Sequence, residues 1–234
     1  MNQVLFIAEC GHNHNGNIPL AKALIWTAKA CGADMAKFQV YDTDTLKLNE
    51  EEKQKGIYSD LKQGELTRDQ LWELKKECDR AKIEFFASAF DIKRISWLEE
   101  IEIKRHKIAS RMIHDKAFIE AIEKTGKPII ASLGWWNKQE LPDIKGKVDY
   151  LYCVAKYPPT DEEMRGMPKK FRKYSGFSDH TIGIRWTQKA IKRGAKIIEK
   201  HFTIDRDMFG CDQKGSIEPF EFKKLIQWTR KLTI

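Results

Sequence analysis

The hydrophobic and polar positions of this chain follow two alternating patterns. Short apolar runs are typical of buried β-strands, and longer segments with apolar residues three or four apart are typical of amphipathic helices. Thr67 precedes one of these longer segments and can cap the amino end of a helix. The pattern therefore predicts strands that alternate with helices. We expect strands at 4–9, 35–40, 84–89, 106–110, 128–133, 150–155, 176–179 and 196–202, and helices at 19–31, 67–82, 92–100, 115–124, 183–193 and 219–231.

Three segments between these elements are less regular. We expect 42–64 to form a loop with a short helix over a site, 137–141 to form a weak helix, and 158–168 to hold at most a short helix. About eight βα units result, and this repetition predicts an α/β fold in which the chain closes into a single (β/α)8 TIM barrel. An open, doubly wound sheet is the alternative. Against it, no GxGxxG motif follows a strand, and polar residues end nearly all of the strands.

Length and composition favour one globular domain. With 234 residues, of which 41% are hydrophobic and 32% charged, we expect a single barrel domain over 1–234. The sequence lacks an apolar run of about 18 residues that could span a membrane, and its first apolar run is too short for a secretory leader. We therefore expect a cytoplasmic protein without a membrane partner.

The net charge of +8 fits an anionic small substrate, nucleic acid or simply a basic surface. The basic residues lie mostly at helical spacing, and no nucleic-acid-binding motif accompanies them, so we expect no nucleic-acid partner. The five cysteines contain no CxxC pair. We interpret them as reduced thiols that pack as small hydrophobic residues, including Cys10, Cys153 and Cys211 near strand ends.

Two histidines end the last two predicted strands. Glu199 and His201 are two residues apart and share one side of a strand, and His180 follows the strand before. With the carboxylates of Asp179, Glu199 and Glu9 nearby, these imidazoles could hold a divalent cation. The alternative, in which each histidine is a hydrogen-bonded core residue or a general base, remains open.

Lysines and serines at other strand ends suggest an anionic ligand. Lys37 and Gln39 share a face of the second strand, and Lys107 lies in the fourth. A lysine is costly to bury unless an anion or a carboxylate compensates its charge. Hydroxyl groups beside lysines commonly bind phosphate, although a single serine at a strand end more often begins a turn. The strand-end serines are Ser88, Ser110, Ser132 and Ser178.

Several motifs together resemble the sialic acid synthase (N-acetylneuraminate synthase) family. They are IAE at 7–9 with NHNG at 13–16, KFQ at 37–39, KIAS at 107–110, YP at 157–158, SDHTIG at 178–183 and EKHFT at 199–203 with DR at 205–206. The resemblance implies a TIM-barrel transferase of carbohydrate biosynthesis. Such an enzyme condenses phosphoenolpyruvate with an aldose, such as N-acetylmannosamine or a related and in some cases phosphorylated sugar. The product is a 2-keto-3-deoxy acid of the sialic or nonulosonic acid type, and phosphate is released.

The resemblance also implies roles for individual residues. His180 and His201 would hold the metal, with Mn expected and Mg, Co or Zn as alternatives. Glu9, Lys37, Lys107 and Glu199 would form the catalytic group, with Glu9 as acid or base. Ser110, Ser132 and Ser178 would bind phosphoenolpyruvate beside the lysines, and Gln39, Tyr157 and Asp212 would lie on the acceptor side. We also expect Ser88 to bind substrate.

The chain departs from the family pattern at several points. Family members usually continue into a small antifreeze-like domain that contributes an arginine to a partner subunit, whereas we expect this chain to be the barrel alone. Arg111 stands where the family usually has glycine. We hypothesise that Arg111 binds an anionic group of the acceptor, because a guanidinium suits phosphate or carboxylate. The expected assembly is a homodimer, with a separate chain completing the acceptor site as an alternative.

Two other functions fit the same residues. A Schiff-base aldolase would use Lys37 or Lys107 as the nucleophile. A non-catalytic sugar or phosphate binder would keep the barrel without the acceptor chemistry, and Met112, where the family usually has an acid, favours it.

Overall fold

The strands close into a parallel barrel. The structure is a computed structural model that describes residues 4–46, 48 and 57–232. Each strand pairs with the next in sequence order, and the last pairs with the first, which gives a closed (β/α)8 barrel and confirms the predicted fold. The strands are β1 (Leu5–Gly11), β2 (Met35–Val40), β3 (Glu84–Ala89), β4 (His106–Ile108), β5 (Ile129–Ser132), β6 (Val148–Cys153), β7 (Gly176–Asp179) and β8 (Ile197–His201).

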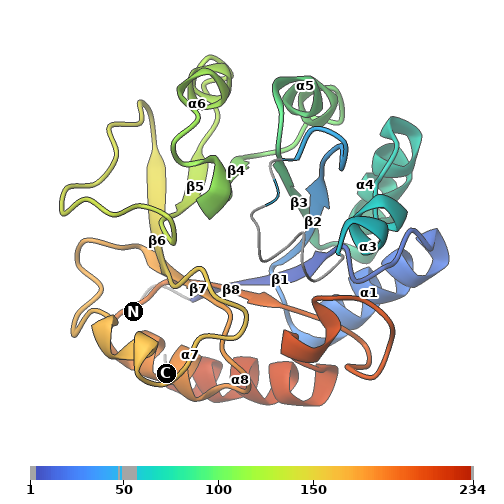
Figure 1. Ribbon diagram of the computed structural model, residues 1–234. Helices are drawn as coiled ribbons and strands as arrows, with labels where there is room; N and C mark the ends of the chain where they lie inside the picture. The colour runs from blue at the N-terminus through green and yellow to red at the C-terminus, as the bar shows by residue number, and fades with distance from the viewer. Residues whose placement is uncertain (1–3, 47, 49–56, 233–234) are drawn as a thin grey trace.

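Helices surround the barrel, as Figure 1 shows. Several begin at a side-chain cap, as the sequence predicts: the Thr67 hydroxyl accepts from the backbone of Gln70, and the Gln70 side chain accepts from the backbone of Thr67. The helices are α1 (Ile18–Cys31), α3 (Tyr58–Gln63), α4 (Arg68–Ala81), α5 (Ile92–Glu100), α6 (Lys116–Glu123), α7 (Arg185–Lys192) and α8 (Pro219–Leu232), with 3-10 turns η1 (Ser110–Met112), η2 (Glu163–Gly166) and η3 (Gln213–Gly215).

The predicted weak helix at 137–141 is wrong. This segment is irregular, and the Trp136 indole donates to the carbonyl oxygen of Glu140 at 2.7 Å across a turn. Pro142 follows immediately, and the residue before a proline, here Leu141, is disfavoured from helical backbone angles. The connection from β5 to β6 consequently contains no helix, although all of its residues are described.

The core has two parts. Apolar side chains on the outer face of the strands pack against the surrounding helices. A smaller cluster fills the barrel interior toward the amino ends of the strands. The interior cluster consists of Ile7, Met35, Phe86, Ile130, Leu151 and Ile197. Because successive residues of a strand point to opposite sides, the residues two positions later on these strands also point into the barrel. This alternation determines which side chains reach the barrel interior at the carboxyl ends of the strands.

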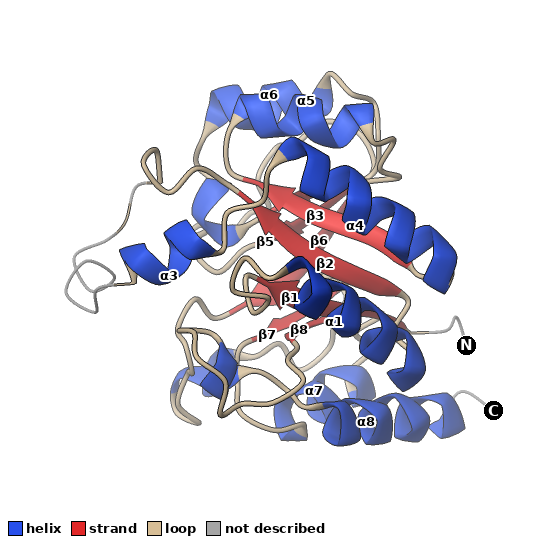
Figure 2. Ribbon diagram, turned by 90° about the vertical axis from the view of Figure 1, so that its right-hand side faces the viewer, coloured by secondary structure: helices blue, strands red, loops and turns tan. Residues whose placement is uncertain are grey.

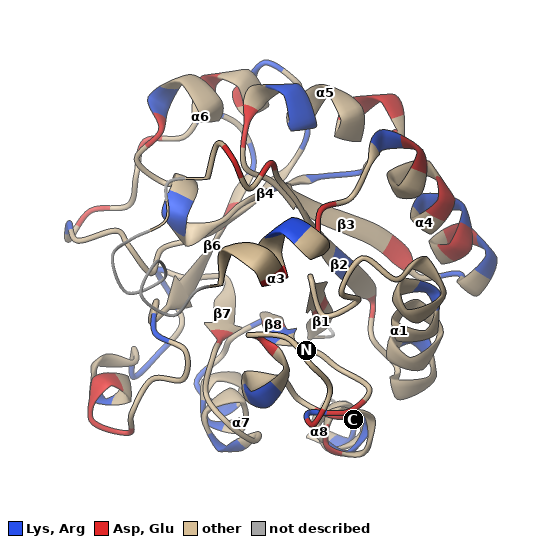
Figure 3. Ribbon diagram, turned by 45° about the vertical axis from the view of Figure 1, so that its right-hand side comes forward, with Lys and Arg blue, Asp and Glu red and all other residues tan. Residues whose placement is uncertain are grey.

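One end of the barrel carries α3. In Figure 2, α3 lies on the side opposite the two chain termini, and Figure 3 shows it across the ring of strands. This confirms a short helix within 42–64, although residues 47 and 49–56 of that predicted loop lie outside the described residues. Acidic and basic residues are interspersed along α4, as expected for a solvated helix face. Among the described helices, none is both long and apolar enough to cross a membrane.

Candidate active site

A cavity of about 430 Å³ opens at the carboxyl ends of the strands. Its wall includes Ile57 and Leu61, so α3 and the residue before it cover part of the opening. A volume of this size suits a small metabolite, and this end of the barrel is where TIM-barrel enzymes have their active sites. With the exception of Asp179, the residues that the sequence suggests for a site line this one cavity.

The strand register builds the cavity floor. Two residues beyond the apolar interior layer, the same strands present Glu9, Lys37, Ser88, Ser132 and Glu199. Each of these side chains is buried. A layer of charged and hydroxyl groups therefore rests directly on the apolar layer, and its members come from five different strands.

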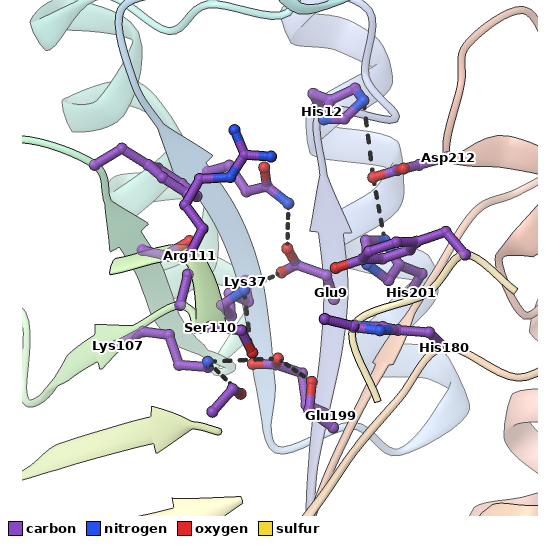
Figure 4. A pocket seen from close by; sticks show the side chains of 18 of the residues that line it. Glu9, His12, Lys37, Lys107, Ser110, Arg111, His180, Glu199, His201 and Asp212 are labelled. Carbon is purple, nitrogen blue, oxygen red and sulfur yellow. Dashed lines mark hydrogen bonds and ion pairs between the residues drawn. The ribbon is translucent and has the colours of Figure 1, made fainter. Parts of the chain in front are cut away.

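Lys107 of β4 lies level with Ser88 of this layer, and the two lysines and two glutamates form a connected group (Figure 4). The Nζ of Lys37 lies 2.8 Å from Oε2 of Glu9 and 3.6 Å from Oε2 of Glu199. The Nζ of Lys107 lies 3.7 Å from Oε1 of Glu199 and donates to the Ser132 hydroxyl at 2.6 Å. The Ser178 hydroxyl donates to Oε1 of Glu199 at 2.8 Å. Glu199 thus contacts both lysines.

The surroundings shift the pKa values of three of these groups. Burial alone would raise the pKa of Glu199, but the charges of Lys107 and Lys37 outweigh it and lower the value to about 2. Burial would lower the pKa of Lys37, but Glu199 and Glu9 outweigh it and raise the value. For Lys107 burial prevails, so its pKa is lowered despite Glu199. Glu199 and Lys37 are therefore charged at neutral pH.

This pairing changes one argument made from the sequence. The two carboxylates already compensate the two buried lysines, so lysine burial alone does not require an anionic ligand. What favours an anion is the set of donors that face the same cavity. These are the lysines, the hydroxyls of Ser88, Ser110, Ser132 and Ser178, and Arg111.

The two predicted metal-binding histidines are neighbours at the cavity rim. The ring centroids of His180 and His201 lie 5.5 Å apart, and the Tyr157 ring stacks on His180 at 4.1 Å. Nδ1 of His180 lies 3.0 Å from the carbonyl oxygen of Val154, which leaves Nε2 as the free ring nitrogen. Nδ1 of His201 is buried without a hydrogen bond and lies 3.3 Å from Oδ2 of Asp212.

Asp179 is not beside these histidines in the cavity, which corrects the expectation from the sequence. Its Oδ2 lies 3.1 Å from Nζ of Lys200 and also accepts from the Thr187 hydroxyl, so it faces the helices outside the barrel. The reason is strand parity: Ser178 points inward, and its neighbour Asp179 must point outward. Glu9 and Glu199 are paired with lysines, so Asp212 is the carboxylate next to the histidines.

Burial would raise the pKa of Asp212, but the nearby His12, His201 and His180 outweigh it and lower the value. Asp212 is therefore an anion at neutral pH. Its Oδ2 also lies 3.7 Å from Nε2 of His12, which is in the loop after β1.

The remaining predicted residues occupy the other side of the cavity. Gln39 donates to Oε1 of Glu9 at 2.8 Å. The Arg111 guanidinium lies over the Trp135 ring, 5.5 Å from its centroid, and Figure 4 shows Arg111 on the side of the cavity opposite the histidines. The Ser110 hydroxyl accepts from the backbone of Gly134 at 3.0 Å.

His12 and Cys211 also line the cavity, and sequence reasoning did not select them. Cys211 was interpreted as a small packing residue, but it is exposed and its Sγ lies 3.1 Å from Nε2 of His12. Cys10 is buried in the core as expected, and Cys153 is buried with its Sγ 3.9 Å from Nδ1 of His180. His12 directly follows the end of β1, which is the signal that could have identified it, whereas Cys211 lies further along the chain in the loop after β8 and carries no such signal.

Comparisons with known proteins agree with this geometry. Residues 24–234 match the NeuB family. The chain is 34% identical to N,N'-diacetyllegionaminic acid synthase of Legionella pneumophila, with 96% of this chain and 70% of the relative covered. It is 30% identical to N-acetylneuraminate-9-phosphate synthase of Homo sapiens, with 96% and 68% covered.

Solved structures give the same picture. The crystal structure of N-acetylneuraminic acid synthetase from Leptospira borgpetersenii, in complex with citrate, is similar with a TM-score of 0.86 and 30% identity, over 99% of this chain and 84% of that one. A truncated 3-deoxy-D-arabino-heptulosonate 7-phosphate synthase from Thermotoga maritima has a TM-score of 0.70 at 15% identity, over 99% and 87%. The second likeness concerns the fold alone.

Proposed function

The chain belongs to the NeuB family, and we propose that it condenses phosphoenolpyruvate with an aldose to give a 2-keto-3-deoxy sugar acid and phosphate. The family and the enzyme class expected from the sequence are confirmed. In the proposed reaction, carbon 3 of phosphoenolpyruvate forms a bond to the aldehyde carbon of the sugar. Water adds at carbon 2, and phosphate leaves. The observation that supports this most is one cavity in which two lysines and several hydroxyls lie opposite a pair of imidazoles.

The donor would bind to the buried polar layer. Lys37 and Lys107 supply two ammonium groups, and Ser132 and Ser178 supply hydroxyls that already belong to the same hydrogen-bonded group. Phosphate and carboxylate oxygens accept strong hydrogen bonds from such donors. Because all of these side chains are buried in strands, they need little reorganisation when the donor binds.

Glu9 and Glu199 would have different roles. Glu9 lies between Lys37 and Gln39 at the top of the layer, within reach of a donor held by the lysines, and would transfer a proton near the reacting carbons. Glu199 contacts both lysines, and the low pKa of its carboxyl group keeps it ionised. It would hold the two ammonium groups at a fixed separation.

The residues at the rim fit a divalent metal. His180 offers Nε2, and His201 has a buried ring nitrogen without a hydrogen bond, which is an unusual condition for a buried polar atom. His180 and His201 would hold the ion, and Mn is the metal we propose on the basis of the family resemblance. A metal bound there would polarise the aldehyde oxygen of the acceptor as a Lewis acid. Tyr157, stacked on His180, would orient the acceptor.

The acceptor would be an N-acylated hexosamine or a related sugar, and Arg111 favours an anionic one. Relatives of this chain include a synthase named for a 9-phosphate product. Arg111 and Trp135 together offer a guanidinium and an aromatic face in the same cavity, across from the histidines. A phosphorylated sugar would use the guanidinium through paired hydrogen bonds.

We further propose that residues 1–234 fold as a single domain in the cytoplasm and associate as a homodimer. Limited proteolysis should then give no stable smaller fragment, and light scattering should give twice the mass of 27.3 kDa. A mass equal to one chain would contradict the dimer.

A Schiff-base aldolase is the second candidate, because burial lowers the pKa of Lys107 and so favours a neutral, nucleophilic amine. Borohydride reduction in the presence of pyruvate or another keto acid would trap a covalent adduct on Lys107. We expect no adduct, because Lys107 already donates to Ser132 and to the carbonyl oxygen of Ile108.

A screen for phosphate release tests the proposed function. Wild-type protein would be incubated with phosphoenolpyruvate and candidate aldoses, with Mn²⁺ or with a chelator. Release that needs both an aldose and the metal supports the proposal. Release at background level with every aldose would instead support a non-catalytic binder.

A further inference from the structure

A second cluster of metal-ligating side chains lies at the rim of the same cavity. It joins His12, in the loop after β1, to Cys211 and Asp212, in the loop after β8. Nε2 of His12 lies 3.1 Å from Sγ of Cys211 and 3.7 Å from Oδ2 of Asp212. One ligand atom from each residue lies within 4.8 Å of the others. His180 does not belong to this cluster.

Hydrogen bonds between the two loops hold the cluster in place. The Asn13 side chain donates to the Ser216 hydroxyl at 2.9 Å, and the Asn15 side chain donates to the carbonyl oxygen of Phe209 at 2.7 Å. In the other direction, the Gln213 side chain donates to the carbonyl oxygen of Asn13 at 2.9 Å. These bonds join segments about two hundred residues apart, so the approach of His12 to Cys211 does not rest on one contact.

The distances fit a tetrahedral ion. Zinc bonds to nitrogen and sulfur are about 2.0 and 2.3 Å long, so neighbouring ligand atoms around a tetrahedral zinc lie roughly 3.3 to 3.6 Å apart. The observed separations of 3.1 and 3.7 Å lie on either side of that range. His12 is buried and Cys211 is exposed, which leaves an open approach from solvent.

We propose that His12, Cys211 and Asp212 form a second cation site that selects a thiophilic ion, Zn²⁺ or Co²⁺, over Mn²⁺. A thiolate with an imidazole and one carboxylate is a ligand set that suits zinc, whereas Mn²⁺ prefers oxygen ligands. The fourth position is open to water. Binding replaces the thiol proton of Cys211 with the cation and releases that proton to solvent. The site connects the loop after β1 with the loop after β8, and the pairing of these two strands closes the barrel.

This site is distinct from the ion proposed between His180 and His201, and it does not depend on the proposed reaction. Asp212 lies between the two, because its Oδ2 is 3.3 Å from Nδ1 of His201 and 3.7 Å from Nε2 of His12. Only the second site includes the thiol of Cys211. A thiol-specific signal therefore separates the two.

Cobalt titration of chelator-treated, reduced protein tests the proposal without any substrate. Cobalt bound to a thiolate gives an intense near-ultraviolet charge-transfer band. We expect this band in the wild type and in a Cys31→Ser control, and its loss in Cys211→Ser. His12→Gln should weaken cobalt affinity by more than about 100-fold, since even changes in residues that only support metal ligands cost 10- to 100-fold. Zn²⁺ should displace the cobalt, and an equal concentration of Mn²⁺ should not.

Three results would overturn the proposal. The wild type could show no band, which would leave His12 and Cys211 as a hydrogen-bonded pair without an ion. The band could persist in Cys211→Ser, which would assign it to another thiol, such as Cys153 beside His180. Unchanged cobalt affinity in His12→Gln would show that the His12 imidazole is not a ligand of the ion. Circular dichroism of each variant would verify that it is folded.

Discussion

Lys37 and Glu9 face each other across the first two strands, and their Nζ and Oε2 atoms lie 2.8 Å apart inside the barrel. The pair follows directly from the register of β1 and β2, in which these two residues are partners. The register of β1 with β8 places Glu9 beside His201. The barrel therefore holds the paired lysines and glutamates of the candidate active site in its strands, and the segments after the strands contribute Arg111, Tyr157 and Asp212 to the cavity.

Glu199 should stabilise the fold through the two lysines that it contacts. Glu199→Gln leaves both ammonium groups with less compensation, and the free energy of unfolding should fall by about 3 kcal/mol or more, as measured by urea denaturation. Inorganic phosphate should raise the melting temperature of this variant more than that of the wild type. Glu84→Gln, which breaks the more exposed pair with Arg105, is the control and should cost less than about 1 kcal/mol. Equal losses would contradict the role of Glu199.

Gly176 should be essential to the pairing of β7 with β8. A Cβ atom at this position would overlap the backbone carbonyl of Ile197, its partner residue on β8. Gly176→Ala should therefore lower the free energy of unfolding by at least about 3 kcal/mol, at the upper end of overpacking effects. Gly215→Ala is the matched control, because an added Cβ there meets no atom within 4 Å. A stable Gly176→Ala protein would show that the strands can separate at little cost.

His106 should make stability depend on pH. Burial lowers its pKa in the folded protein, although its hydrogen bond with Glu99 opposes this. Below pH 6.5 the His106 imidazole is therefore protonated to a greater extent in the unfolded chain than in the folded protein. The free energy of unfolding should consequently fall as pH falls through this value. Urea denaturation at pH 7.5, 6.5 and 5.5 would measure the free energy of unfolding of the wild type and of His106→Gln. The difference between the two free energies should become smaller toward low pH. A difference that grows would indicate that the pKa is raised instead.

Arg111 should determine affinity for an anionic acceptor. Arg111→Ala should raise the KM for a phosphorylated aldose about 10- to 100-fold, which corresponds to a lost charged hydrogen bond of about 1.5 to 3 kcal/mol. The KM for phosphoenolpyruvate should change little. Arg111→Lys should be intermediate, because it keeps the charge and loses the paired geometry. Arg68→Ala, on α4, serves as the control, and equal effects on both substrates would argue against the assignment.

The strand and helix order could be predicted from the sequence because each strand combines an apolar run with a polar end. Ile7 and Glu9 illustrate this on β1, and Ile197 with Glu199 and His201 on β8. The two-residue period of a strand places such pairs on the same side, so the members of the polar layer could be named in advance. The prediction for Asp179 did not follow this period. Asp179 is the direct neighbour of the inward-pointing Ser178 on the same strand, so its side chain points out of the barrel.

The second cluster could not be predicted in this way. His12 and Cys211 meet because the loops after β1 and β8 pack together through Asn13, Asn15 and Gln213. Such contacts depend on loop conformation, including the left-handed backbone of Gly11 at φ +50°, and not on strand periodicity. The irregular segment at 137–141 was missed for a related reason, since a single turn bond from Trp136 replaces helical hydrogen bonds there.

Carbon–carbon bond formation is tested most directly by ¹³C NMR with phosphoenolpyruvate labelled at carbon 3 and an aldose labelled at its aldehyde carbon. With protein, Mn²⁺ and a suitable aldose, the olefinic carbon signal should be replaced by a methylene signal coupled to the former aldehyde carbon, and His201→Ala should prevent this. A methyl signal from labelled pyruvate would contradict the account, because it would show that the protein only removes phosphate from the donor.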